Sequence, residues 1–266
     1  MPNRRDFLKA VSTLGIAPTL ATAGNIRPKL LIVVAHPDDE CFAFGGALSL
    51  AADRGIETLV VCLTDGQAAT NRGDAASSAE LGAMRRAEFA ASCKVLGVTH
   101  HELLDYQDGR LEFVDFSRTA GRLVERIRRF RPDVVLTFGS EGALNTHPDH
   151  MLVSMLTTAA FHWSGRPNRY PDLAQPFQPT RLFTLTSSYV MPDRQPPLLA
   201  PWTVVLDISA VRERKSLAFQ QHTSQLPLFE RTKTLFEEHG AYEYYTLLAS
   251  PIREPATVTN DLFAGL

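Results

Sequence analysis

Residues 29–40 read KLLIVVAHPDDE, an apolar run over 29–35 followed at once by a histidine, a proline and three acidic residues. A short apolar run rich in Val and Ile is typical of a strand buried on both faces of a sheet. Adjacent carboxylates repel one another, so the polar cluster is unfavourable unless a cation or strong hydrogen-bond donors lie beside it. We therefore expect a buried strand that ends in a turn able to bind a divalent metal.

The flanking segments alternate between strand and helix patterns. We expect helices over 45–54, 79–96, 116–130, 151–161, 212–222 and 234–248. We expect further strands over 57–63, 98–104, 133–138, 181–187 and 203–208. Strands that alternate with helices imply right-handed crossovers. The sequence thus predicts an α/β fold, with three α/β/α layers and a mainly parallel, Rossmann-like sheet.

A second polar cluster, HPDH at 147–150, lies between the predicted strand 133–138 and the next helix. In such folds ligands bind beyond the carboxyl ends of the strands, where both clusters fall. Two histidines at this spacing can face one way at the start of a helix. Together the clusters offer histidine and carboxylate ligands with room for water, which is typical of a catalytic zinc site. A two-histidine, one-carboxylate set also suits Fe(II) in an oxygenase, although those sites usually occur in β-barrel folds.

The two clusters carry a family resemblance. AHPDDE at 35–40 and HPDH at 147–150 resemble the two motifs of the LmbE-like, or PIG-L-like, metal-dependent N-acetylglucosaminyl deacetylases. Weaker features follow in the family's order: LTDG at 63–66, RRAE at 85–88, DG at 108–109 and HTSQ at 222–225. The resemblance covers roughly residues 28 to 225.

This resemblance implies a role for each residue of the two motifs. The metal, zinc or else Fe²⁺ or another divalent ion, is expected to bind His36, Asp39 and His150. Asp38 matches the general base. His147 matches the residue that steadies the oxyanion or protonates the leaving amine.

The resemblance extends to residues outside the two motifs. Arg85 and Asp108 match positions that contact sugar hydroxyls. Glu40 is expected to orient the loop or cap the helix, and His222 to support the site from behind. The lead-in to the second motif, ALNT at 143–146, lacks the aromatic residue that some relatives place there.

The implied reaction removes the N-acetyl group from an N-acetylglucosamine-type sugar or glycoconjugate and releases acetate and an amino sugar. Two alternatives stay open: a metal-dependent amidase or deacylase acting on another amide of a glycolipid or glycopeptide, and a carbohydrate-binding relative without catalysis. Residues 166–202 hold eight of the 17 prolines and are expected to form surface loops that shape the pocket. Tyr170, Phe177 and Trp202 either line it or pack in the core. A homo-oligomer is common in the resembled family.

Composition excludes several other classes of protein. The formal net charge is -2 and the pI about 6.4, without the basic stripe of a nucleic-acid-binding protein. No run of 18 apolar residues predicts a membrane span. The three cysteines are odd in number and form no CxxC, which argues against a disulfide framework.

The N-terminus is expected to be an export signal. NRRDFLK at 3–9 resembles the twin-arginine consensus, an apolar stretch follows over 10–20, and ATA at 21–23 offers small residues for a signal peptidase. We therefore predict a twin-arginine-type signal over 1–23, a single deacetylase domain over 24–266, engagement of the twin-arginine export machinery, and a periplasmic or extracellular location.

Overall fold

A seven-stranded sheet forms the centre of the computed structural model, which describes residues 27–189, 197–253 and 256–266 of the 266. The expected signal segment, 1–23, lies outside the described residues. The strands are β1 (Lys29–Val34), β2 (Glu57–Thr64), β3 (His100–Tyr106), β4 (Val134–Thr137), β5 (Arg181–Thr186), β6 (Val204–Asp207) and β7 (Tyr242–Ala249). Their order is β3-β2-β1-β4-β5-β7-β6, and β7 runs antiparallel to both of its neighbours.

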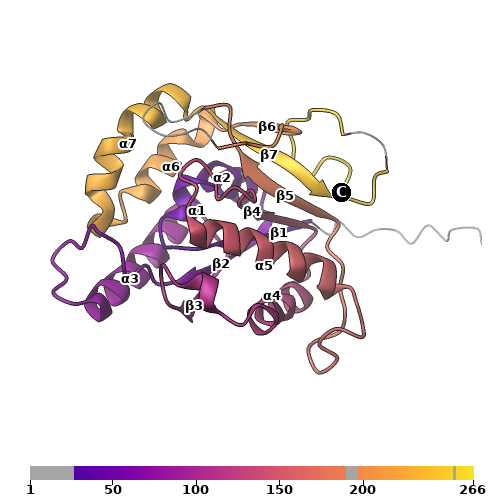
Figure 1. Ribbon diagram of the computed structural model, residues 1–266. Helices are drawn as coiled ribbons and strands as arrows, with labels where there is room; N and C mark the ends of the chain where they lie inside the picture. Colours follow the sequence, from indigo (N-terminus) through magenta and orange to yellow (C-terminus); the bar gives the residue numbers. More distant parts are fainter. Residues whose placement is uncertain (1–26, 190–196, 254–255) are drawn as a thin grey trace, which may run out of the picture.

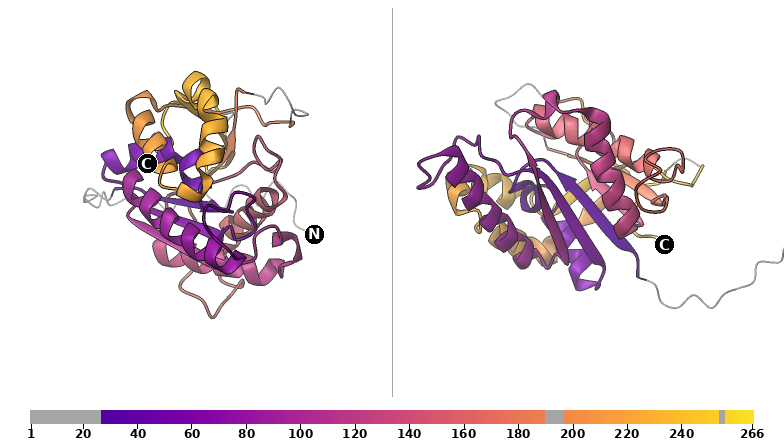
Figure 2. Two further views of the ribbon diagram at one scale, coloured as in Figure 1. Left: turned by 90° about the vertical axis from the view of Figure 1, so that its left-hand side faces the viewer. Right: turned by 90° about the horizontal axis from the view of Figure 1, so that it is seen from below.

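Helices cover both faces of this sheet (Figure 1, Figure 2). One layer holds α1 (Asp39–Phe42), α2 (Gly45–Asp53), α3 (Ser78–Leu96), α6 (Arg212–Phe219) and α7 (Leu226–His239); the other holds α4 (Phe116–Phe130) and α5 (Pro148–Ser164). The three-layer α/β/α fold with a mainly parallel sheet is confirmed. None of the described helices is both long and apolar enough to cross a bilayer.

The two motifs meet because β1 and β4 are neighbours in the sheet, with Leu30 opposite Val134. From β1 the chain steps outward through β2 to β3, and from β4 it steps the other way to β5. The direction of winding therefore reverses between β1 and β4. The connections after these two strands pass to opposite layers. In this class of fold, ligands usually bind at the carboxyl ends of strands where the winding reverses.

The expected helix over 234–248 is wrong beyond residue 239. α7 ends at His239, with Gly240 as its C-cap, and the chain then forms the antiparallel strand β7. Within β7 the side chains alternate: Tyr242 and Leu248 are exposed, whereas Glu243 and Tyr245 are buried. This period of two belongs to a strand, and pairing with β5 and β6 on both sides overrides the helical propensity of the segment.

Several element boundaries also differ from the expectation; for example, α7 begins at Leu226 rather than 234. β3 begins at His100 rather than 98, and α6 ends at Phe219 rather than 222. α5 begins at Pro148 rather than 151, with His147 as its N-cap. Proline suits the first helical turn because its missing N–H would have no helical partner there. The second motif therefore belongs to the first turn of a helix rather than to a loop.

β7 also supports the layer that carries the first motif. The buried carboxylate of Glu243 accepts hydrogen bonds from the backbone N–H groups of Gly46 (2.7 Å) and Ala47 (2.9 Å), in the first turn of α2. Lys215 Nζ (2.7 Å) and the Tyr245 hydroxyl (2.6 Å) donate to the same carboxylate. A carboxylate at a helix N-terminus is favourable because the first N–H groups lack helical partners.

Glu243→Ala is expected to lower the free energy of unfolding by about 3–5 kcal/mol, because it leaves the Lys215 ammonium buried without its counter-ion. Urea denaturation measures the change. Glu125→Ala is the matched control: it removes a partly exposed carboxylate that pairs with Arg129 at 2.8 Å, and such surface pairs contribute only about 0.5 kcal/mol. Equal losses in the two variants would contradict the role given to Glu243.

Candidate active site

The turn after β1 holds the Asp39 carboxylate in a fixed position. Asp39 Oδ2 accepts hydrogen bonds from the backbone N–H groups of Ala35 (3.2 Å) and His36 (2.8 Å). Asp39 Oδ1 lies 3.2 Å from His150 Nε2, and Oδ2 lies 3.5 Å from His36 Nδ1. Burial opposes ionisation, but the adjacent His150 and His36 hold the pKa of Asp39 well below its usual value. One carboxylate thus joins the two motifs.

Each of the two histidines beside Asp39 engages its other ring nitrogen with oxygen. His150 Nδ1 lies 3.2 Å from the carbonyl oxygen of Gly142. His36 Nε2 lies 3.0 Å from Asp108 Oδ1 and 3.2 Å from Asp149 Oδ2. Although burial opposes the charge, these carboxylates raise the pKa of His36 well above its usual value.

Such contacts fix which nitrogen of each ring faces the site. Histidines that bind metals commonly donate their second nitrogen to a carboxylate or a carbonyl. His36 Nδ1 and His150 Nε2 both face the Asp39 carboxylate, and we call these three residues the donor set; that they bind the metal stays a prediction. All three residues are nearly buried, and three protein ligands with an open fourth position are typical of catalytic zinc.

His147 lies beside this donor set. Ring nitrogens of His36, His147 and His150 lie within 4.8 Å of one another. His147 is the N-cap of α5, and its Nδ1 accepts a hydrogen bond of 3.2 Å from the Asp149 N–H. A ring with this acceptor at Nδ1 carries its proton on Nε2. Burial and the neighbouring His36 and His150 lower the pKa of His147, so the neutral ring offers one donor at Nε2.

Asp38 occupies a strained position next to the donor set. Its φ of 115° lies in the left-handed region, which is unfavourable for any residue other than glycine. The backbone N–H of Asp38 donates to Glu40 Oε2 (2.9 Å), and its Oδ2 pairs with Arg85 Nη2 at 2.8 Å. Burial raises the pKa of Asp38 to about 6. A carboxylate with such a pKa can accept a proton and remain largely ionised at neutral pH.

The expected support from Glu40 and His222 is found. Glu40 is fully buried, and its Oε1 lies 2.7 Å from His222 Nε2 and accepts a hydrogen bond of 2.5 Å from Ser92 Oγ. Burial opposes ionisation, yet the adjacent His222 lowers the pKa of Glu40. This buried pair joins α1, α3 and the turn after α6, and it anchors the backbone of Asp38.

Arg85 and Asp108 also lie in the site, where they hold its other residues. Arg85 is 2% exposed, and besides Asp38 its guanidinium donates to the carbonyl oxygens of Pro37 and Gly66. Asp108 is 8% exposed; it contacts His36 and accepts a hydrogen bond from the Ala68 N–H at 3.0 Å. Their expected contact with sugar hydroxyls stays a prediction.

Two further residues complete the site and had no assigned role in the sequence. Asp149 joins three segments, because its carboxylate contacts His36 and accepts hydrogen bonds from the N–H groups of Gly109 (2.8 Å) and Leu111 (3.2 Å). The carbonyl of Gly142 faces both His150 and the N–H of His147. The position of Asp149 between the two histidines of HPDH was its only sequence signal, and Gly142 had none beyond being a glycine near that motif.

The three aromatic residues considered for the pocket wall, Tyr170, Phe177 and Trp202, make their contacts away from the two motifs. The Tyr170 hydroxyl donates to the Ser117 carbonyl in α4 at 2.7 Å, and Phe177 packs beneath the Arg131 guanidinium at the end of that helix. Trp202 is partly exposed against Tyr244 of β7. The contacts of Tyr170 and Phe177 match the core-packing alternative, whereas Trp202 is exposed and does not pack in the core.

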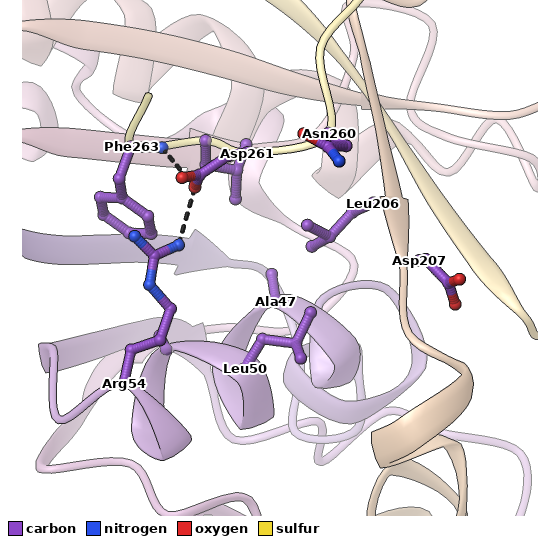
Figure 3. Close-up of a pocket in the computed structure, with 10 residues that line it drawn as sticks. Ala47, Leu50, Arg54, Leu206, Asp207, Asn260, Asp261 and Phe263 are labelled. Atoms are coloured by element: carbon purple, nitrogen blue, oxygen red, sulfur yellow. Dashed lines mark hydrogen bonds and ion pairs between the residues drawn. The ribbon is translucent and has the colours of Figure 1, made fainter. Parts of the chain in front are cut away.

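A hollow of about 240 Å³ lies between α2, β6 and the C-terminal segment (Figure 3). Its floor includes Ala47, Leu50 and Leu206, and at its edge Arg54 pairs with Asp261 at 2.7 Å. None of the motif residues lines it. The hollow offers no titratable cluster comparable to that at the carboxyl ends of β1 and β4.

Comparisons with known proteins agree with this geometry. A family model described as GlcNAc-PI de-N-acetylase, PIG-L, matches residues 31–161. A 1D-myo-inositol 2-acetamido-2-deoxy-alpha-D-glucopyranoside deacetylase of Acidothermus cellulolyticus is 30% identical over 89% of this chain and 94% of its own. The chain belongs to the PIG-L family. The two polar motifs, 35–40 and 147–150, both lie within the part of the chain that the PIG-L model matches.

Two further proteins similar to this PIG-L chain are named as diacetylchitobiose deacetylases. The diacetylchitobiose deacetylase of Thermococcus kodakarensis is 32% identical over 76% of this chain and 72% of its own. The solved structure of an N,N'-diacetylchitobiose deacetylase from Pyrococcus horikoshii superposes with a TM-score of 0.70 at 20% identity, covering 95% of this chain and 98% of that one. The latter likeness concerns the fold.

Gly142→Ala is expected to weaken binding of zinc by at least about 10-fold. Gly142 has a φ of +82°, and a Cβ there would lie 2.7 Å from the His147 carbonyl oxygen, so the turn that directs His150 must shift. Competition with a chromophoric chelator measures the affinity. Gly265→Ala is the matched control, because Gly265 lies near the C-terminus and has a φ of +76° with nothing within 4 Å of such a Cβ. Equal weakening in both variants would assign the effect to backbone strain alone.

Proposed function

We propose that this PIG-L family chain is a zinc-dependent N-deacetylase that hydrolyses the acetamido group of an N-acetylglucosamine-type sugar or glycoconjugate. The observation that carries the proposal is the placement of Asp38. Its partly buried carboxylate, with a pKa raised to about 6, lies in the turn whose next residue, Asp39, contacts both His36 and His150. A base beside a metal-binding donor set is what amide hydrolysis by water requires.

The metal would be held by His36, Asp39 and His150. Two imidazole nitrogens and one carboxylate oxygen suit zinc, and they suit Fe²⁺ or another divalent ion as well. When bound, such an ion supplies Lewis-acid chemistry, because it polarises a carbonyl oxygen and acidifies water. Metal analysis of purified protein distinguishes among these ions.

The residues of the chain supply the remaining steps. Asp38 accepts a proton from water as the water attacks the acetyl carbonyl carbon, and Arg85 holds the carboxylate of Asp38 in place at 2.8 Å. The Nε2–H of His147 donates to the oxyanion that develops on the carbonyl oxygen. The proton held by Asp38 then passes to the leaving nitrogen as the C–N bond breaks. The products are acetate and a free amino sugar.

Two alternatives to this function are an enzyme that hydrolyses another amide bond and a carbohydrate-binding protein that hydrolyses none. A longer acyl chain or another amide conjugate would use the same base and ligands. A carbohydrate-binding protein without catalysis has no need of a buried base beside a metal site, so the arrangement of Asp38 favours an enzyme. The names of the relatives favour an acetylated amino sugar as the substrate.

Asp38→Asn is expected to retain the metal and to lower turnover by about 10²–10⁴-fold, because the amide cannot accept the proton. Asp39→Ala is expected to lose the metal and all activity. Primary-amine release from free N-acetylglucosamine, chito-oligomers, and inositol and lipid conjugates measures turnover, with and without a chelator. Normal turnover in Asp38→Asn would refute the base assignment. If the zinc-loaded wild type released no amine from any compound of the panel, the substrate would instead be a different amide.

We also propose that the chain is exported by the twin-arginine route, on the basis of NRRDFLK at 3–9 and ATA at 21–23. Expression in a bacterium with a functional twin-arginine pathway is expected to give exported protein whose N-terminal sequence begins after Ala23. Replacing Arg4 and Arg5 with Lys is expected to retain the protein in the cytoplasm. Export that is unchanged in this double variant would contradict the proposal.

A further inference from the structure

One ring of the donor set lies flat against a phenylalanine. The rings of Phe138 and His150 are parallel, with an interplanar angle of 2° and centroids 4.0 Å apart. Phe138 is 1% exposed and His150 5%. Phe138 directly follows the last residue of β4, so its backbone belongs to the rigid sheet. The imidazole therefore rests on a surface that the core holds in place.

The core behind Phe138 leaves it no room to retreat. Phe44 packs against it with ring centroids 5.6 Å apart, and Tyr245 of β7 stacks on Phe44 at 6.3 Å. All three rings are essentially buried. Protein interiors are close-packed, so a ring in such a stack can shift only if its neighbours shift as well. The stack extends from the antiparallel strand β7 to the donor set.

The Gly142 carbonyl and the Phe138 ring constrain His150 in complementary ways. The contact between His150 Nδ1 and the Gly142 oxygen, at 3.2 Å, fixes one nitrogen but permits the ring to turn about the line of the hydrogen bond. The face of Phe138 removes that freedom because it defines the plane of the imidazole. Both constraints together direct Nε2 toward Asp39, 3.2 Å away.

The electrostatic interaction between the two stacked rings favours the state in which His150 binds a metal. An aromatic ring has a negative face, which attracts an electron-poor partner. An imidazole becomes electron-poor when its free nitrogen binds a cation. The attraction to Phe138 is therefore stronger when His150 is a ligand than when it is a free neutral ring.

We propose that Phe138 is a positioning residue that sets the plane of the His150 imidazole and thereby the affinity and coordination geometry of the metal site. The proposal rests on the metal site given under the proposed function. It concerns metal binding, which is measured without any substrate.

The test compares Phe138→Leu with Phe89→Leu, which makes the same change at a buried ring outside the stack. Zinc and cobalt affinities are measured by competition with a chromophoric chelator, and folding by urea denaturation. Phe138→Leu is expected to weaken metal binding about 10-fold and Phe89→Leu by less than about 2-fold, although both remove a buried ring. The absorption spectrum of the cobalt-loaded protein is expected to change in Phe138→Leu alone. Phe138→Tyr keeps a flat ring and is expected to restore most of the affinity.

Three outcomes would overturn the proposal. Wild-type affinity and spectrum in Phe138→Leu would show that the stack does not position the ligand. Equal weakening in Phe138→Leu and Phe89→Leu would assign the effect to general loss of packing. Absence of metal binding by the wild type would remove the donor set itself. A wild type that binds zinc but releases no amine would refute the deacetylase function and leave this inference standing.

Discussion

The pairing of β1 with β4 is the constraint on which the rest of the site depends. These two parallel strands are adjacent in space but about 100 residues apart in sequence, and each ends in a polar motif. The chain leaves them toward opposite layers, and in this class of fold the carboxyl ends of such a pair are where ligands usually bind. The Asp39 carboxylate then lies between His36 of the first motif and His150 of the second.

Much of this arrangement could be predicted from the sequence because its signals are local. Apolar runs rich in Val and Ile identified the inner strands, and Gly55 and Gly97, both with positive φ, ended helices where expected. Two polar clusters at strand ends placed the site. The contacts of Glu40 and His222 agree with the support expected from the family resemblance. The roles of His36, Asp38 and His150 remain predictions that the geometry supports.

The remainder depends on contacts between distant segments, which single-sequence patterns do not encode. Tyr242–Ala249 has residues compatible with a helix or a strand, and only pairing with β5 and β6 decides between them. Nothing in the local sequence distinguishes Glu243 from other acidic residues, because its role comes from two N–H groups of the distant helix α2. Phe138 is the last residue of the predicted strand 133–138 and has no sequence signal beyond that of an apolar strand residue, and only the fold brings His150 onto its face.

The backbone of Asp38 has a consequence for how such a chain can change over time. A left-handed φ of 115° and the removal from water of a guanidinium and its partly buried partner carboxylate both oppose folding at this one position. A relaxed turn would make the folded protein more stable, whereas the proposed reaction requires the strained turn that holds Asp38 in place. Proteins that accumulate stabilising changes tend to lose activity at such positions. Selection for catalysis alone would maintain this turn, so a descendant freed from that selection should lose the conformation of residue 38 before it loses its fold.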